Sequence, residues 1–177
     1  MKRVLLVGGC GFVGCALSHV LHDRGDEVMV FDMAPIPHAV LESVKVYMKG
    51  DVTDLDLLVE ALERFQPDIV IHLASYGMSG GPMLSDDCYR INIGGVEAVL
   101  EAMRQTETEC LIYTSTYNVV YGGEEINGGD EQAPYYPAEL HTDKYSPSKA
   151  AAEQLVLAAN GKDNMRTLAL RPAAIYG

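Results

Sequence analysis

Short apolar runs rich in β-branched residues alternate along this chain with longer segments whose apolar residues recur at helical spacing. The first run, Val4–Val7, ends directly in glycines, and a helical pattern follows at Phe12–Arg24. A second run, Val28–Phe31, ends at Asp32. A strand, a glycine-rich turn, a helix and a second strand within about 30 residues have the size of a βαβ unit.

The alternation continues along the whole chain. Further strands are predicted at Val44–Met48, Ile69–Leu73, Cys110–Thr114 and Thr167–Leu170, and further helices at Leu55–Phe65, Ser85–Gln105 and Ser146–Ala159. Strands that alternate with helices of about 10 to 20 residues indicate an α/β fold with a doubly wound parallel sheet, the Rossmann fold. Residues 1–177 are predicted to form one such domain.

Composition excludes several classes of partner. The 177 residues carry 25 acidic and 13 basic side chains, and the formal net charge of −12 disfavours nucleic acid and anionic membrane surfaces. Lys2 and Arg3 precede an apolar stretch that imitates a secretory signal, but glycines interrupt it, and no apolar run has the length of a membrane span. The four scattered cysteines predict reduced thiols in a cytoplasmic protein, and no His, Cys or carboxylate cluster predicts a metal site.

The first turn has the spacing of a dinucleotide-binding fingerprint, Gly8-x-x-Gly11-x-x-Gly14. The first glycine permits a tight turn, the second lets the backbone approach a pyrophosphate, and the third lets helix and strand pack closely. Phe12 and Val13 open the helix, where free N–H groups meet the phosphate charge. The alternative is a glycine-rich turn with packing duties alone.

Two aspartates follow predicted strands at the same sheet edge. Asp32 is expected to accept hydrogen bonds from the adenosine ribose and to repel a 2′-phosphate, which favours NAD over NADP, because no nearby arginine offers compensation. The alternative is a solvated aspartate that opens a loop. Asp51 and Val52 are expected to contact the adenine, and helix capping by Thr53 or Asp54 is the competing role.

Tyr145 and Lys149 are four residues apart and share one face of a predicted helix. A phenol with a pKa near 10 needs about 4 kcal/mol to reach half ionisation at neutral pH. An ammonium about 4 Å away, at an effective dielectric constant near 20, supplies about that much. Lys149 is therefore predicted to lower the pKa of Tyr145. Taken alone, this spacing is common, and a surface pair is the alternative.

In combination these motifs resemble the extended short-chain dehydrogenases/reductases, the NAD-dependent epimerase/dehydratase superfamily, over essentially the whole chain. The matching residues, in the family's order, are the glycine-rich turn, Asp51-Val52, His72-Leu73-Ala74, Asn92, Thr114-Ser115-Thr116, Tyr145-x-x-x-Lys149 and Arg171-Pro172. The chain is most similar to the 3β-hydroxysteroid dehydrogenase/isomerase branch, on the evidence of three segments. They are Ile112–Thr116, Tyr145–Lys149 with Ala152-Glu153-Gln154, and Leu157–Gly161.

The resemblance implies a role for each matching residue. Tyr145 is the general acid/base, and Lys149 lowers its pKa and binds the nicotinamide ribose. Thr116 hydrogen-bonds the reacting oxygen, with Ser115 as the competitor. Asn92 helps to fix the active site, or is a helix asparagine satisfied by backbone. The residues implied to bind NAD are Gly8, Gly11, Phe12, Val13, Gly14, Asp32, Asp51, Val52, Leu73, Ala74, Tyr145, Lys149 and Pro172.

His72 ends a buried strand, and we expect a hydrogen-bonded structural histidine there rather than a catalytic one.

The function implied is an NAD-dependent oxidoreductase that converts a secondary alcohol of a small-molecule substrate, steroid-like in this branch, to a ketone. Two alternatives stay open: a nucleotide-sugar epimerase or dehydratase, and an NAD-binding module or fragment without catalysis. Family members continue for about 100 or more residues after the final motif, so the C-terminal substrate region is expected to be absent and an apolar edge is expected near the sixth strand. The family also implies a possible homodimer through the helices that carry Asn92 and Tyr145.

Overall fold

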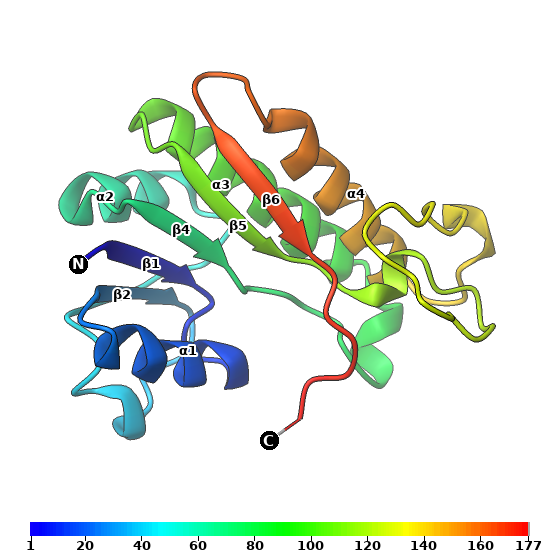
Figure 1. Ribbon diagram of the computed structural model, residues 1–177, viewed down its shortest axis with the longest axis horizontal. Coiled ribbons are helices and arrows are strands. Elements are labelled where there is room, and N and C mark those ends of the chain that lie inside the picture. The colour runs from blue at the N-terminus through cyan, green and yellow to red at the C-terminus, as the bar shows by residue number, and fades with distance from the viewer. Residues whose placement is uncertain (177) are drawn as a thin grey trace.

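The structure, a computed structural model, describes residues 1–176, and its centre is one parallel six-stranded sheet (Figure 1). The strands are β1 (Arg3–Val7), β2 (Glu27–Asp32), β3 (Val46–Lys49), β4 (Ile69–His72), β5 (Cys110–Thr114) and β6 (Arg166–Leu170). Their order is β3-β2-β1-β4-β5-β6, and every neighbouring pair is parallel. The predicted doubly wound sheet is therefore confirmed.

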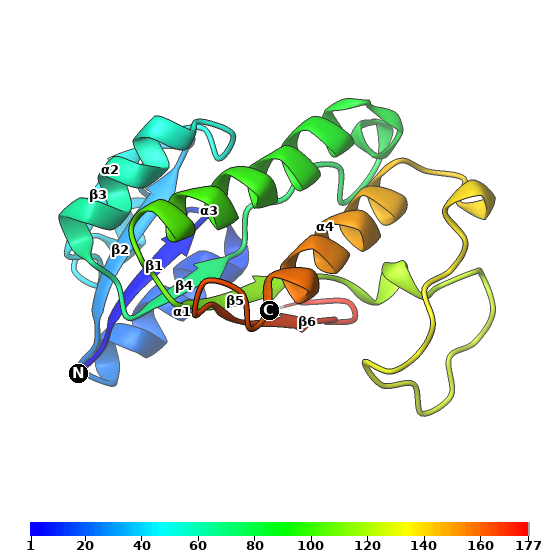
Figure 2. The same ribbon diagram turned by 90° about the horizontal axis from the view of Figure 1, so that it is seen from above.

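Helices cover both faces of the sheet. They are α1 (Phe12–Asp23), α2 (Leu55–Phe65), α3 (Gly94–Gln105) and α4 (Tyr145–Ala159). Figure 2 shows α2, α3 and α4 on one face and α1 on the other. Single 3₁₀ turns lie at His38–Val40, Gly81–Leu84, Tyr117–Val119 and Ala138–Leu140, and a π-helical turn lies at Tyr89–Ile93.

Alternation along the strands divides the core into two layers. Leu5 and Val7 belong to the larger layer with residues of α2, α3 and α4, whereas Val4 and Leu6 belong to a smaller layer that Leu21 of α1 closes. Successive side chains of a strand point to opposite faces, so a strand buried on both faces is apolar throughout. This explains why the strands read as continuous apolar runs in the sequence.

The long helix predicted at Ser85–Gln105 is present from Asp87 onward, but it is not α-helical throughout, because a π-helical turn at Tyr89–Ile93 precedes α3. The widened turn carries Asn92, whose buried amide hydrogen-bonds outside its own helix. Such turns arise where tertiary contacts outweigh the regular helical ladder.

Aspartate carboxylates cap the starts of α2 and α4. At the start of α2 the cap is Asp54 rather than Thr53, since the Asp54 carboxylate accepts from the Leu57 N–H at 3.1 Å. At the start of α4 the Asp143 carboxylate accepts from the N–H of Ser146 at 2.6 Å. Pro147 thus lies in the first turn, where it removes no helical hydrogen bond.

β6 is an edge strand of the sheet, and the apolar edge expected there is present. Leu168 and Leu170 on this strand are 45% and 51% exposed. Within residues 1–176, no helix combines the length and the apolar character needed to cross a bilayer.

Candidate functional site

Two adjoining cavities lie at the carboxyl edge of the sheet. The first cavity, of about 340 Å³, follows β2, β3 and β4, and the second cavity, of about 450 Å³, follows β5 and β6 and reaches α4. Gly8, Gly11, Leu73, Ser75 and Met78 line both. The two cavities therefore form one groove across the point where the strand order reverses, which is where open α/β sheets bind their ligands.

The glycine-rich turn forms the centre of the groove. Gly8 has φ +85°, and a Cβ there would lie 2.4 Å from the backbone nitrogen of Ala74. At Gly11 the nearest atom to a Cβ is the Gly8 oxygen at 3.6 Å, so a side chain would extend into the groove. A Cβ at Gly14 would meet the Gly9 carbonyl at 2.4 Å, so the third glycine packs α1 against the turn itself.

The start of α1 offers positive charge to the negatively charged phosphates of a dinucleotide. Gly11 is its N-cap and offers no side-chain cap, and Phe12 and Val13 of the first turn line the second cavity. First-turn N–H groups lack intrahelical partners and carry the positive end of the helix dipole. These groups lie beside Gly11, whose missing side chain leaves the groove open, and they fit a pyrophosphate.

Asp32 and Asp51 supply the carboxylates of the first cavity. Asp32 Oδ2 accepts from the N–H of Cys10 and Oδ1 from the N–H of Ala34, both at 2.9 Å. Asp51 Oδ1 accepts from the N–H and the hydroxyl of Thr53, also at 2.9 Å. Asp32 is therefore tied to the glycine-rich turn and is not merely a solvated residue at the start of a loop.

The sequence offers no arginine close to Asp32, but the fold places one in the cavity that Asp32 lines. Arg90 lines the same first cavity and pairs with Asp87 at 3.0 Å. It is distant from Asp32 in the sequence and reaches the cavity only because β4 lies between β1 and β5.

The second cavity brings together Thr116, Tyr145 and Lys149. Lys149 is buried, its Nζ donates to the Thr114 carbonyl at 2.8 Å, and it lies 4.2 Å from the centroid of the Tyr113 ring. Burial lowers the pKa of Lys149 to about 7, and the Glu153 carboxylate opposes this shift.

The predicted lowering of the Tyr145 pKa is not found. Burial raises the pKa of Tyr145, and the opposing groups are the hydroxyls of Ser75 and Thr116. Desolvation outweighs the electrostatic gain that the spacing suggested, and the Lys149 ammonium is directed to the Thr114 carbonyl.

The hydroxyls of Ser115 and Thr116 have different partners. Ser115 donates to the buried Glu153 carboxylate, away from Tyr145. Thr116 lines the second cavity together with Tyr145, and its oxygen accepts from the N–H of Asn118 at 3.3 Å. Geometry therefore favours Thr116 over Ser115 as the hydroxyl beside a reacting oxygen.

Asn92 acts behind the groove rather than in it. Its Oδ1 accepts from the Tyr76 N–H at 2.8 Å, and its Nδ2 donates to the Tyr76 carbonyl at 3.0 Å and to Ser148 Oγ at 2.9 Å. Ser148 in turn donates to the Tyr145 carbonyl at 2.7 Å. Asn92 thus joins the loop after β4 to the start of α4 and positions both.

His72 is buried in the core, as predicted, but the hydrogen bonds expected for it are missing. Among the described residues neither ring nitrogen has a partner, and the ring packs edge-on against Tyr113 at 5.5 Å. Burial, and next the Lys149 charge, lower its pKa to about 3. The ring is therefore neutral at physiological pH.

The residues predicted to bind NAD all line one cavity or the other. Sequence reasoning missed other lining residues, including Cys10, Ser75, Tyr76, Met78, Arg90, Tyr117 and Ala173–Ile175. Ser75 and Tyr76 directly follow the His72-Leu73-Ala74 motif at the carboxyl edge of the sheet. Their position in the sequence could therefore have predicted that they line the groove.

Comparison with known proteins gives relatives over the whole chain. The chain is 40% identical over 183 residues to short-chain dehydrogenase/reductase family 42E member 1 of Macaca fascicularis, covering 99% of this chain and 46% of that protein. It is 40% identical over 185 residues to the 3 beta-hydroxysteroid dehydrogenase/Delta 5-->4-isomerase of Mycobacterium tuberculosis, covering 100% of this chain and 48% of that protein. The chain thus spans about half the length of the curated relatives it matches.

Solved structures give the same fold. The UDP-glucose 4-epimerase of Brucella ovis in complex with NAD has a TM-score of 0.83 at 28% identity, covering 97% of this chain and 51% of that one. The Thermus thermophilus UDP-glucose 4-epimerase complex with NAD has a TM-score of 0.79 at 29% identity, covering 96% of this chain and 54% of that one. The sequence model of the 3-beta hydroxysteroid dehydrogenase/isomerase family matches residues 5–177, and the chain belongs to that family.

Proposed function

We propose that the groove binds NAD, with the adenosine in the first cavity and the nicotinamide end in the second. The glycine-rich turn and the start of α1 lie between them and receive the pyrophosphate. Asp32 accepts from the ribose, and Asp51 and Val52 contact the adenine. The related epimerase structures are complexes with NAD, which supports this choice.

The reaction proposed for the whole protein is the oxidation of a secondary alcohol to a ketone, with a 3β-hydroxysteroid as the substrate class. NAD supplies the hydride acceptor. Tyr145, as the phenolate, takes the hydroxyl proton, and Thr116 hydrogen-bonds the same oxygen. Lys149 is the group that holds the nicotinamide ribose.

The raised pKa of Tyr145 determines whether its side chain acts as a proton donor or as a proton acceptor at neutral pH. Burial keeps the phenol protonated at neutral pH, so it can donate a proton to a ketone oxygen. Alcohol oxidation needs the phenolate and is expected to accelerate as the pH rises. Ketone reduction is expected to slow over the same range, and pH profiles in both directions measure the contrast.

One observation carries the proposal: Thr116, Tyr145 and Lys149 line a single cavity with the glycine-rich turn. Tyr145→Phe in the whole protein is expected to abolish turnover and to leave NADH binding intact. Tyr121→Phe, which removes an exposed phenol, is the matched control. Turnover that survives Tyr145→Phe contradicts the assignment.

A nucleotide-sugar epimerase is the second candidate, favoured by the 28% and 29% identical epimerase structures. It uses the same cofactor with the same tyrosine and lysine. Comparing the turnover of UDP- and dTDP-sugars with that of 3β-hydroxysteroids separates the two activities.

The third candidate, an NAD-binding module without catalysis, is favoured by the half-length coverage of the relatives. It predicts calorimetric NAD binding without hydride transfer to any alcohol.

The solution state is part of the proposal. Residues 1–177 form one NAD-binding domain, which predicts a single unfolding transition with coincident fluorescence and circular dichroism midpoints. A homodimer through the helices that carry Asn92 and Tyr145 predicts twice the chain mass in sedimentation equilibrium. A cytoplasmic location predicts recovery in the cytoplasmic fraction of cells.

A further inference from the structure

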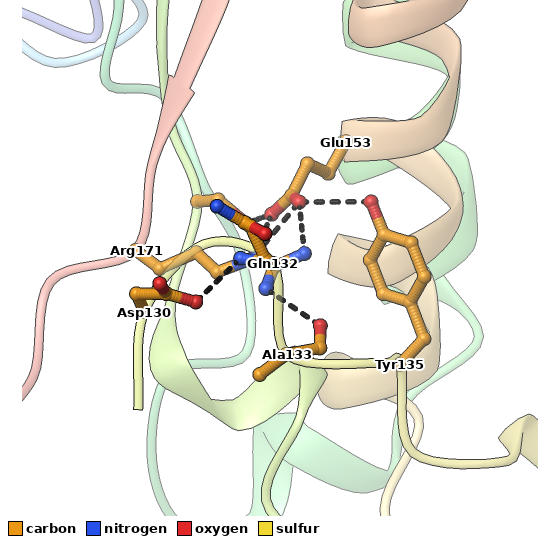
Figure 3. A network of polar contacts seen from close by, with 7 residues as sticks. Asp130, Gln132, Ala133, Tyr135, Glu153 and Arg171 are labelled. Carbon is orange, nitrogen blue, oxygen red and sulfur yellow. Dashed lines mark hydrogen bonds and ion pairs between the residues drawn. The ribbon is translucent and has the colours of Figure 1, made fainter. Parts of the chain in front are cut away.

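A buried carboxylate lies one helical turn beyond Lys149 on α4. Glu153 is 1% exposed and accepts hydrogen bonds from three other parts of the chain. Tyr135 Oη donates at 2.8 Å, Arg171 donates through Nη2 at 2.7 Å and Nε at 3.0 Å, and the Ser115 hydroxyl donates as well. Figure 3 shows Tyr135 and Arg171 pointing toward this carboxylate. We call these four residues the Glu153 cluster.

The Glu153 cluster satisfies its charges internally. The Arg171 side chain is 7% exposed, and its Nη1 donates to the Ala133 carbonyl at 3.1 Å. Its guanidinium also lies 5.0 Å from the Tyr135 ring centroid. Burial alone would raise the pKa of Glu153, but the hydrogen bonds from Arg171, Ser115 and Tyr135 outweigh it and lower the pKa. Glu153 is therefore ionised at neutral pH, and loss of one partner leaves a buried charge uncompensated.

The cluster touches the walls of the second cavity from behind. Ser115 stands between Thr114, whose carbonyl accepts from Lys149, and Thr116, which lines the second cavity together with Tyr145. Arg171 directly precedes Pro172, which lines the cavity and whose carbonyl accepts from the Tyr117 N–H at 3.1 Å. One carboxylate thus holds the chain after β5 and the chain after β6 against the helix that carries Tyr145 and Lys149.

We propose that Glu153 is a positioning residue for the nicotinamide end of the NAD site. By holding Ser115 and Arg171, it fixes the Thr114 carbonyl, the Thr116 hydroxyl and Pro172 around the second cavity. This inference rests on the proposed NAD function, and the competing role is stabilisation of the fold alone.

Binding of two probes to the whole chain tests the proposal. NADH spans both cavities, whereas ADP occupies only the adenosine and phosphate side, far from Glu153. Glu153→Gln is expected to raise the dissociation constant of NADH about tenfold or more, the scale of one lost charge-assisted hydrogen bond, and to change that of ADP less than about twofold. Glu101→Gln is the matched control, because Glu101 pairs with Arg104 at 2.6 Å on the exposed face of α3.

A second variant addresses folding. If Glu153→Gln alone fails to fold, Glu153→Gln with Arg171→Met removes both buried charges together. This double variant is expected to fold and still to bind NADH weakly and ADP normally. NADH binding at the wild-type level in either folded variant overturns the proposal, and so does a parallel loss of NADH and ADP binding.

A third readout does not need the cofactor. ¹³C-labelled lysine side chains report the Lys149 titration near pH 7, assigned with Lys149→Met. Ser115→Ala keeps the Glu153 charge but releases the chain beside Thr114, so the Lys149 midpoint is expected to shift. An unchanged midpoint overturns the positioning role. A wild-type chain that does not bind NADH contradicts the proposed function, and the Lys149 titration still decides the role of Glu153.

Discussion

The ammonium of Lys149 lies 4.2 Å from the centroid of the Tyr113 ring, inside the core. A ring face attracts a cation, so Tyr113 offsets part of the desolvation that lowers the pKa of Lys149 to about 7. The Tyr113 hydroxyl has no hydrogen-bond partner among residues 1–176. The ring, rather than the hydroxyl, is therefore the part of Tyr113 that Lys149 uses.

Replacing this ring is expected to change the titration of Lys149. Tyr113→Leu removes the cation–π contact and is expected to lower the pKa of Lys149 further below 7. Tyr113→Phe keeps the ring and is expected to leave this pKa in place. It also removes a buried unpaired hydroxyl and is expected to stabilise the fold by up to about 1 kcal/mol. Lysine ¹³C NMR and urea unfolding measure both effects, and equal Lys149 midpoints in the two variants would contradict this account.

His72 is expected to make stability depend on acid. Its folded pKa of about 3 lies below its ordinary value of 6.5, so the unfolded chain binds a proton that the folded chain excludes. The contribution of neutral His72 to the free energy of unfolding is fully present above pH 6.5. It is lost as the pH falls toward 3, at up to about 1.4 kcal/mol per pH unit. The free energy of unfolding, measured with urea at pH 7 and at pH 5, should differ less between the two pH values for His72→Leu than for wild type. His22→Gln, at an exposed site on α1, should keep the wild-type difference.

Gly8 and Gly25 form a matched pair for separating backbone strain from steric overlap. Their φ values are +85° and +84°, but a Cβ at Gly25 has no heavy atom within 4 Å, whereas a Cβ at Gly8 would lie 2.4 Å from the Ala74 nitrogen. Gly25→Ala is expected to cost about 1 kcal/mol from strain alone. Gly8→Ala is expected to cost about 3 kcal/mol more from overpacking and to abolish NADH binding. Equal losses of stability would show that overlap at Gly8 is relieved.

The sequence predicted the sheet well, because local patterns determine it. β5 occupies Cys110–Thr114 as predicted, and α2 occupies Leu55–Phe65 as predicted. The groove could also be predicted, since parallel strands bring the residues after their carboxyl ends to one edge. What the local pattern did not predict was the π-helical turn within the long helix, where the contacts of Asn92 with Tyr76 and Ser148 favour it.

The electrostatics of the site could not be read from spacing alone. Tyr145 and Lys149 share a helix face as predicted, but their pKa shifts depend on burial, which the sequence does not display. Glu153 lies on α4 and Arg171, 18 residues later, directly follows β6, so only the packing of α4 beside β6 brings them together.

The last prediction concerns the choice between NAD and NADP. Asp32→Ala is expected to weaken NADH binding, because the ribose loses an acceptor, and to narrow the preference over NADPH, because repulsion of the 2′-phosphate disappears. Arg90 lines the same cavity and is the cation available to a 2′-phosphate there. Asp51→Ala serves as the comparison, because it removes the other carboxylate of the cavity, on the adenine side. It should weaken the binding of NADH and the binding of NADPH by the same factor. Fluorescence titration of wild type and the two variants gives all six dissociation constants, and an Asp32→Ala variant with wild-type values for both cofactors would remove Asp32 from the ribose site.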